Sequence, residues 1–324
     1  MTNRKTSNIL VCGSLAYDRI MDFPGRFRDH ILPEKIHLLN VAFTVNDLKE
    51  SFGGTAGNIA YNLALLGERP KIIGVVGNDF VKYEQWLRKN KIDISSIKKV
   101  KNQPTASAYI MTDQEDNQIT AFYPGPLDGF GKLTAGKLGA SLLVRKEKVK
   151  LAIIAPDYVA RMVKYAKIFK RWKVPYIFDP GQQITSLKAG ELKSAVTGAK
   201  VLVGNDYEIQ LILNRLKLKL SQLVKLVEIL IITKGERGSE IYQQSKKIKI
   251  PPAKPKNTFD PTGAGDAYRA GLIKGLIKNW PLEKVGRLAG LVAVYTVEKY
   301  GTQTHRFSWK GLGGRYRENF GEKL

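Results

Sequence analysis

A short acidic turn near the C-terminal end of the chain contains residue types suited to phosphate chemistry. Residues 259–271 read FDPTGAGDAYRAG, and the turn from Thr262 to Gly265 leads directly into an apolar helical pattern. The unpaired N–H groups of such a helix start carry partial positive charge and suit an anion, especially a phosphoryl group. Asp266 would be repelled by that anion unless it accepted a proton from an attacking hydroxyl. Phosphoryl transfer to an alcohol requires both features, whereas an ordinary helix cap would also use Asp and Gly.

A second set of polar residues, near the N-terminus, could bind a hydroxylated ligand. Asp18 follows the strand-like run Ile9–Cys12, at the sheet edge where α/β proteins bind ligands. Its carboxylate can accept hydrogen bonds from two vicinal hydroxyls; the alternative is a turn aspartate. Gly53 and Gly54 let another molecule approach the backbone, and Asn58 in the following helical turn could hydrogen-bond a hydroxyl. A glycine turn with a capping asparagine is also a common structural pair.

A third set follows two strand-like runs in the C-terminal half. Asn205 and Glu208 in NDYE are one helical turn apart and therefore share a face; a capped helix start is the alternative interpretation. Thr233, Gly235 and Gly238 in TKGERG form a turn that could hold the ribose and phosphates of a nucleotide through backbone groups and a hydroxyl. Glu208 is too isolated to form a metal site alone, and the three histidines lack ligand spacing.

These residues need a scaffold, and the pattern along the chain predicts an α/β fold. Apolar strand-like runs alternate with helical patterns, which is typical of a parallel sheet with helices on both faces. Two segments, about 19–52 and 104–124, break this alternation. The second contains a hairpin pattern around Gln114 to Asn117. We expect one domain, residues 1–324, in which these two insertions form a small β-sheet lid over a cleft.

The net charge of +24, from 53 basic and 29 acidic residues, raises the question of a nucleic-acid partner. The basic residues are scattered, and no finger, RNP-like or basic-zipper pattern accompanies them. We therefore expect a solvated basic surface and an acidic small substrate, with no specific nucleic-acid target.

The cellular compartment is predicted from cysteine usage and hydropathy. Cys12 is the single cysteine and sits in an apolar run, which indicates a buried thiol in a reducing compartment. The longest apolar stretch, residues 288–297, is too short to cross a bilayer, and the first residues lead straight into a strand pattern. These features predict a cytoplasmic protein without a membrane partner.

The motifs together resemble a known family. DPTGAGDAYRAG is similar to the C-terminal signature of the ribokinase-like (PfkB) sugar and nucleoside kinases. The segments GSLAYDRIMDFPGRF, LPEKIH and GGTAGNIAYNLALLG resemble the acceptor-binding half of that family, and NDYE and TKGERG its nucleotide half. The resemblance runs from Gly13 to about Gln303. FPGRF, LPE, FYPG and DPGQQ resemble the bacterial adenosine kinases more than the ribokinases or fructokinases.

This resemblance implies a three-layer α/β sandwich with a mainly parallel central sheet and a small β-sheet lid. It implies ATP-dependent transfer of the γ-phosphoryl group to the 5′-hydroxyl of a ribonucleoside, adenosine first. Asp266 would be the catalytic base, with an anion hole at Gly263, Ala264 and Gly265. The nucleotide would be bound by Asn205, Glu208, Thr233, Gly235, Gly238 and Thr262, and the acceptor by Ser14, Asp18, Gly53, Gly54, Asn58, Phe122 and Gln182.

Several implications concern the ligands and the alternatives. Mg²⁺ would arrive with ATP, with Glu208 near it through water, and a monovalent-cation requirement stays open. Phe122 could stack on a purine, although Ala108, where related adenosine kinases can carry an aromatic, leaves the base pocket thinner. A sugar kinase of the same family and a non-catalytic basic nucleic-acid-binding protein are the alternatives. The exposed small sheet leaves homodimer formation through the lid open.

Overall fold

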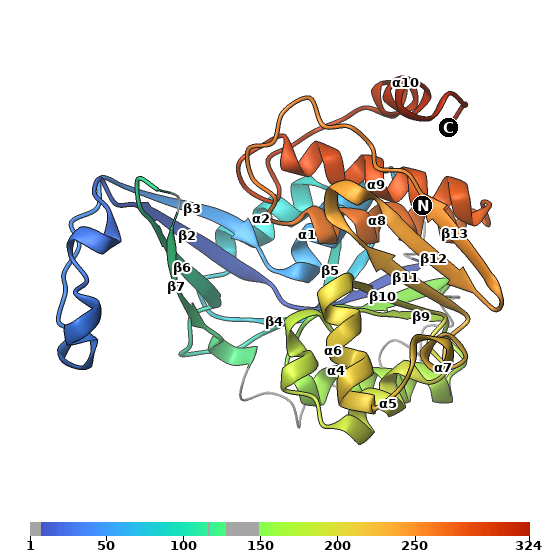
Figure 1. The fold of residues 1–324 in the computed structure, drawn as a ribbon, viewed down its shortest axis with the longest axis horizontal. Helices are drawn as coiled ribbons and strands as arrows, with labels where there is room; N and C mark the ends of the chain where they lie inside the picture. Colours follow the sequence, from blue (N-terminus) through green and yellow to red (C-terminus); the bar gives the residue numbers. More distant parts are fainter. Residues whose placement is uncertain (1–7, 116, 128–148) are drawn as a thin grey trace, which may run out of the picture.

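A large sheet forms the centre of the molecule in the computed structural model, which describes residues 8–115, 117–127 and 149–324 (Figure 1). Within these residues the sheet has nine strands. In spatial order they are β13 (Lys246–Ile250), β12 (Ser239–Gln243), β11 (Ile229–Thr233), β10 (Val201–Asn205), β9 (Tyr176–Phe178), β8 (Leu151–Ile154), β1 (Ile9–Cys12), β4 (Lys71–Val76) and β5 (Asp93–Lys99). The strands from β11 to β5 run parallel, and β12 and β13 form an antiparallel edge.

Helices cover both faces of this sheet because its strands are apolar on both sides. On β1, Ile9 and Val11 pack into one core while Leu10 and Cys12 pack into the other, as the two-residue period of a strand requires. One face carries α1 (Thr55–Leu65), α2 (Val81–Lys89), α8 (Ala264–Ile277), α9 (Leu282–Val297) and α10 (Trp309–Phe320). The other carries α4 (Val159–Arg171), α5 (Ala189–Val196), α6 (Asp206–Leu216) and α7 (Leu220–Val224). The predicted three-layer α/β architecture is therefore confirmed.

Short 3-10 helices occur in the connecting segments. They are η1 (Phe27–Asp29), η2 (Pro33–Leu38), η3 (Gly125–Leu127), η4 (Gly181–Thr185) and η5 (Gly235–Arg237).

A smaller sheet lies beside the large one, at the left of Figure 1. Its strand order is β3 (Asp47–Gly53), β2 (Ala16–Asp22), β6 (Ala106–Thr112) and β7 (Gln118–Tyr123). The register aligns Ser51, Asp18, Ala108 and Phe122 in one row across the four strands. Directly paired residues point to the same face of a sheet, so Asp18 and Phe122 share a face with Ala108 between them. Closure of this sheet over a cleft stays a prediction.

The strand order of the large sheet has a topological switch point at β1, where α/β proteins commonly bind ligands. From β1, the strand order continues through β4 to β5 on one side and through β8 to β11 on the other. Ligands bind beyond the carboxyl ends of the strands at such a switch point. The Ser14 N–H donates to the Pro156 carbonyl across it at 3.2 Å. Cys12, at the end of β1, is buried as expected.

Within the described residues, no helix has the length and apolar character needed to span a membrane.

Candidate active site

A pocket of about 480 Å³ lies beyond the carboxyl ends of the parallel strands. The ends of several strands each contribute a polar residue to its lining: Asp179 after β9, Asn205 at the end of β10 and Thr233 at the end of β11. The start of α8 closes the pocket with Gly263, Gly265, Asp266 and Arg269. The fold therefore gathers the predicted acidic turn and the predicted nucleotide residues around one cavity.

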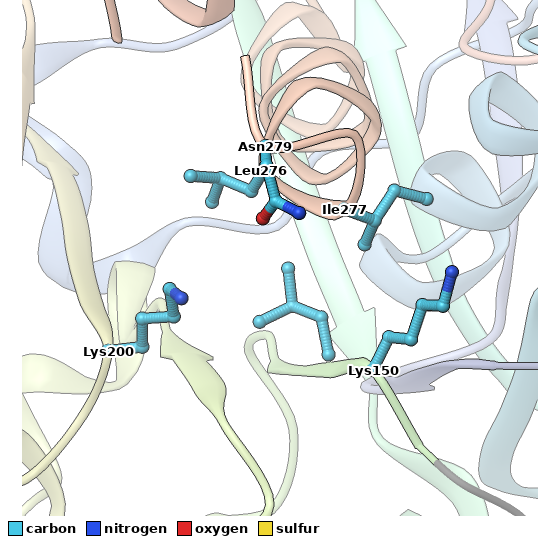
Figure 2. A pocket seen from close by; sticks show the side chains of 6 residues that line it. Lys150, Lys200, Leu276, Ile277 and Asn279 are labelled. Carbon is cyan, nitrogen blue, oxygen red and sulfur yellow. The ribbon is translucent and has the colours of Figure 1, made fainter. Parts of the chain in front are cut away.

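Another pocket, shown in Figure 2, lies at the opposite ends of the strands. It measures about 290 Å³ and is lined by Lys150, Leu151, Lys200, Leu276, Ile277 and Asn279. Lys150 precedes β8 and Lys200 precedes β10, so this pocket is at the amino ends. Its lining includes no carboxylate or imidazole that could accept a proton, which favours the pocket beside Asp266 as the catalytic one.

The anion-binding turn is formed by the start of α8. Gly263 is the N-cap residue with φ of +79°, and a Cβ there would lie 2.8 Å from Thr302 Cγ2, so only glycine fits without strain. In the described residues, the N–H groups of Gly263, Gly265 and Asp266 donate to no protein acceptor, whereas the Ala264 N–H donates to the Pro261 carbonyl at 3.2 Å. Three free donors at a helix N-terminus are a suitable site for a phosphoryl group.

Asp266 lies in the first turn of α8 with its carboxylate beside these donors. Asn58 Nδ2 donates to Asp266 Oδ2 at 2.8 Å. Burial raises the pKa of Asp266 to about 7; Asn58 and Arg269 oppose this rise, and the charges of Asp179 and Asp18 add to it. A carboxyl group with a pKa near neutrality is matched to proton abstraction at physiological pH.

Sequence reasoning missed a buried ion pair at the floor of the pocket. Arg269 Nε donates to Asp179 Oδ2 at 2.8 Å, and Arg269 Nη2 donates to Asp179 Oδ1 at 3.0 Å. Arg269 Nη1 also donates to the Gly265 carbonyl at 3.1 Å. The pair thus holds the glycine turn and keeps a guanidinium next to Asp266. The available signal was Arg269 itself, which is three residues after Asp266 and therefore on the same side of the helix.

Asn205 and Glu208 line the pocket and also cap α6. The Asn205 N–H donates to Glu208 Oε2 at 2.8 Å, and the Glu208 N–H donates to Asn205 Oδ1 at 2.7 Å. This is a capping box, the alternative interpretation of the NDYE motif. Burial is the main cause of the raised pKa of Glu208. Among the described residues no cluster of three or more His, Cys, Asp or Glu could hold a metal ion by itself.

Some of the remaining residues predicted to bind the nucleotide line the pocket, and the others lie outside its lining. Thr233, Gly235 and Gln182, the last predicted for the acceptor, line the pocket. Gly238 is outside the lining, and its carbonyl accepts the Lys234 N–H at 2.8 Å in the turn between β11 and β12. Thr262 is also outside the lining, and its N–H donates to the Asp260 carboxylate at 2.9 Å.

Asp18, predicted to bind the acceptor, lies in β2 of the small sheet and is not part of the pocket lining. A Cβ at Gly53 would lie 2.2 Å from Asp18 Oδ2, so the carboxylate occupies space that only glycine leaves free. Burial, followed by the charge of Asp260, raises the pKa of Asp18 to about 6. Phe122 shares the face of Asp18 in the small sheet and is 56% exposed, so its ring is available to a ligand.

Ser14 and Gly54 support the start of α1. Ser14 Oγ accepts the Thr55 N–H at 3.2 Å and lies 3.2 Å from Thr55 Oγ1. Gly54 is the N-cap residue of the same helix. Thr55 lines the pocket, so these two residues fix the part of α1 that borders the site.

The chain is similar to known kinases over most of its length. The family described as pfkB family carbohydrate kinase matches residues 14–309. A nucleoside kinase of Methanocaldococcus jannaschii is 32% identical over 278 residues, which are 85% of this chain and 89% of that protein. A cytidine kinase of Thermococcus kodakarensis is 27% identical over 259 residues, which are 77% of this chain and 88% of that protein.

The fold is also similar to solved structures of the nucleoside kinase of Burkholderia thailandensis. The complex of that protein with inosine has a TM-score of 0.85 and 34% identity, covering 97% of this chain and 99% of that chain. Its complex with ADP and inosine has a TM-score of 0.83 and 35% identity, covering 97% of both chains.

Proposed function

The chain belongs to the pfkB family of carbohydrate kinases, and from that premise we propose that it transfers the γ-phosphoryl group of ATP to the 5′-hydroxyl of a purine ribonucleoside. It is a phosphotransferase with an alcohol acceptor. The observation that carries the proposal is the position of Asp266. Its carboxylate, with a pKa of about 7, lies in the same helical turn as the free N–H groups of Gly263 and Gly265.

The transfer needs a base and an anion site within one bound complex. Asp266 would accept the proton of the 5′-hydroxyl as its oxygen attacks the γ-phosphorus, and the bond between that phosphorus and the β-phosphate bridging oxygen would break. The free amides of Gly263, Gly265 and Asp266 would hold the charge on the transferred group. Arg269, held by Asp179, adds a fixed positive charge beside this turn.

The donor nucleotide fits the part of the pocket formed by the ends of β10 and β11. Thr233 and Gly235 line this part, and relatives with bound ADP support ATP as the donor. Mg²⁺ bound to the phosphates would neutralise charge during transfer. Glu208 is the carboxylate suited to meet it through water, since one of its oxygens already accepts the Asn205 N–H.

The acceptor fits the row of residues across the small sheet. Neighbouring strands are about 4.8 Å apart, so Phe122, two strands from Asp18, is about 10 Å from it, a span comparable with that from ribose hydroxyls to the base. Asp18 would accept hydrogen bonds from the two vicinal ribose hydroxyls, and Phe122 would stack on the base. Ala108 between them leaves room for a bicyclic purine.

Stacking does not distinguish a 6-amino from a 6-oxo group, because every base has a π-face. We therefore propose adenosine and inosine as acceptors alike, the second being the ligand in the structure of the B. thailandensis relative. A nucleoside without the 2′-hydroxyl would lose one of the two hydrogen bonds to Asp18 and bind more weakly.

A substrate panel with ATP and Mg²⁺ tests this proposal. Adenosine, 2′-deoxyadenosine, inosine, guanosine, cytidine, ribose, fructose and fructose phosphate are compared by ADP formation, and products are identified by mass. We expect the 5′-monophosphates of adenosine and inosine, with 2′-deoxyadenosine a poorer acceptor. Turnover of free sugars without turnover of any nucleoside would refute the nucleoside assignment. Salt-sensitive binding to RNA without ATP consumption would refute the kinase itself.

A further inference from the structure

A series of buried hydrogen bonds leads from Trp86 through Gln303 and Asn58 to Asp266. The donor and acceptor roles along this series are fixed by Trp86. The indole N–H of Trp86 can only donate, and it donates to Gln303 Oε1 at 3.0 Å. The other end of the Gln303 amide is therefore its NH₂ group. Gln303 Nε2 donates to Asn58 Oδ1 at 3.0 Å and to the Tyr83 hydroxyl at 2.6 Å. The donor character of one indole thus sets the orientation of the next amide along the chain of contacts.

The orientation of the Gln303 amide determines the orientation of the Asn58 amide, which contacts Asp266. Its Oδ1 accepts from Gln303 and also faces Thr302 Oγ1 at 2.8 Å, so its Nδ2 is directed to Asp266 Oδ2 at 2.8 Å. Asn58 is 5% exposed and Gln303 is 4% exposed, so water does not compete for these groups. If the Asn58 amide were reversed, its oxygen would face the carboxylate and its NH₂ would face the NH₂ of Gln303, which is costly for buried groups.

We propose that Gln303, oriented by Trp86, is a positioning residue that keeps the Asn58 amide nitrogen on Asp266. One carboxylate oxygen is then occupied, and Asp266 Oδ1 is left to receive the proton of the acceptor hydroxyl. This inference rests on the proposed role of Asp266 as the base. It assigns Asn58 to the orientation of the base, in addition to the acceptor contact predicted for it.

The same network reaches the acceptor side. The Tyr83 hydroxyl, which accepts from Gln303, donates to the Gly53 carbonyl at 2.8 Å. Gly53 is the residue against which Asp18 lies. Tyr83 donates its own proton to Gly53, so the loss of Gln303 leaves this contact to the acceptor strand in place.

Several charged or titratable groups face Asp266. They are Asp18 from β2, Asp179 after β9, Arg269 from α8 itself and the Tyr83 hydroxyl from α2. A substitution of Gln303 by an uncharged residue changes none of these charges. A change in the protonation of Asp266 in such a variant would therefore report the loss of the Asn58 hydrogen bond.

The test replaces Gln303 by methionine, a residue of similar size. Gln303→Met removes the donor to Asn58 and adds no charge near Asp266. We expect kcat to fall about tenfold or more at pH 7 while KM for the nucleoside changes less than about threefold. The acid limb of the pH–rate profile should move up by about one pH unit, because a hydrogen bond that favours the charged carboxylate is lost.

A matched control removes a hydrogen bond of similar burial that does not reach Asp266. The Tyr61 hydroxyl donates to the His305 carbonyl at 2.6 Å from the same helix as Asn58. Tyr61→Phe should lower the melting temperature and leave the pH–rate profile unchanged. If Gln303→Met behaves in the same way, Gln303 has only a structural role and the inference is wrong.

A measurement without substrate separates this inference from the proposed function. The ¹⁵N side-chain resonance of Asn58, identified by its absence in Asn58→Ser, should shift with pH in the wild-type protein with a midpoint near 7, following Asp266. In Gln303→Met the midpoint should rise or the pH response should disappear. If this variant does not fold, Trp86→Phe is used instead and should show the same change to a smaller extent. An unchanged midpoint in the folded variant would overturn the inference, whatever the substrate panel shows.

Discussion

Replacing Asp266 by Asn should abolish turnover and, at the same time, make the folded protein more stable. The substitution keeps an oxygen that can accept the Asn58 hydrogen bond, and it removes the group that accepts the proton. Loss of a general base reduces the rate about 10²- to 10⁴-fold, which is about 3–5 kcal/mol in the activation barrier. Binding of ATP should persist because the amides of the glycine turn are unchanged.

The gain in stability follows from the pKa of Asp266. Burial raises that pKa from 3.8 to about 7 in the folded protein. Between these values the unfolded chain releases a proton that the folded protein retains, so the free energy of unfolding falls as the pH rises from about 4 to 7. The difference between pKa values of 3.8 and about 7 corresponds to about 4 kcal/mol of unfolding free energy. Because Asp266 is only half-buried, we discount this to about 2 kcal/mol.

The expected shift in melting temperature can be measured by calorimetry. The unfolding entropy of about 2.1 cal/mol/K per residue is about 0.7 kcal/mol/K for 324 residues. Asp266→Asn should therefore melt about 3 °C higher than the wild type at pH 8, and the difference should disappear below about pH 3, where the wild-type carboxyl is protonated in both states. Asp22→Asn, on an exposed position of the small sheet, is the control and should change neither property. A variant that retains more than a tenth of the wild-type kcat would remove Asp266 from the role of base. A stability difference that does not depend on pH would contradict the burial account.

Three further predictions use the same assays. The acid limb of kcat/KM should cover pH 6 to 7 and be steeper than one proton, because Asp18 and Asp266 have pKa values of about 6 and 7 and both must be ionised; Asp18→Asn should reduce it to one proton. Arg269→Met should destabilise the fold by about 3–5 kcal/mol because Asp179 is left buried without its partner, and the double variant that also carries Asp179→Asn should regain part of the melting temperature. Phe122→Ala should raise KM for adenosine about 10- to 100-fold with kcat nearly unchanged, the loss expected for one base stacked on an aromatic ring; an unchanged KM would remove Phe122 from the base site.

Much of the fold could be predicted from the sequence because its strands are short apolar runs between helical patterns. The strand-like run predicted at Ile9–Cys12 has the limits of β1 in the structure. The strand β5 was not predicted. Its sequence, DISSIKK, has few apolar residues because it is an edge strand with half-buried side chains. A pattern based on hydrophobicity is weak at such an edge.

The chemistry of the site was predictable only where it depends on neighbouring residues. The glycine turn and Asp266 are adjacent in sequence, so a local pattern indicates an anion site. The pairing of Arg269 with Asp179 joins residues 90 apart, and Gln303 reaches Asn58 across 245 residues. Contacts of this kind depend on the packing of helices against the sheet, and no spacing rule along the chain indicates them.

The hydrogen bond between Asn58 and Asp266 joins residues 208 apart, which affects how the protein is completed during synthesis. Ribosomes add about 5–20 residues per second, so the helix that carries Asn58 leaves the ribosome well before its partners on α8 and at residues 302 and 303. Until they arrive, its amide must be solvated by water. A nascent chain that ends before residue 302 therefore lacks the groups that orient the Asn58 amide toward the carboxylate, and phosphate transfer should begin only after the C-terminal residues have docked.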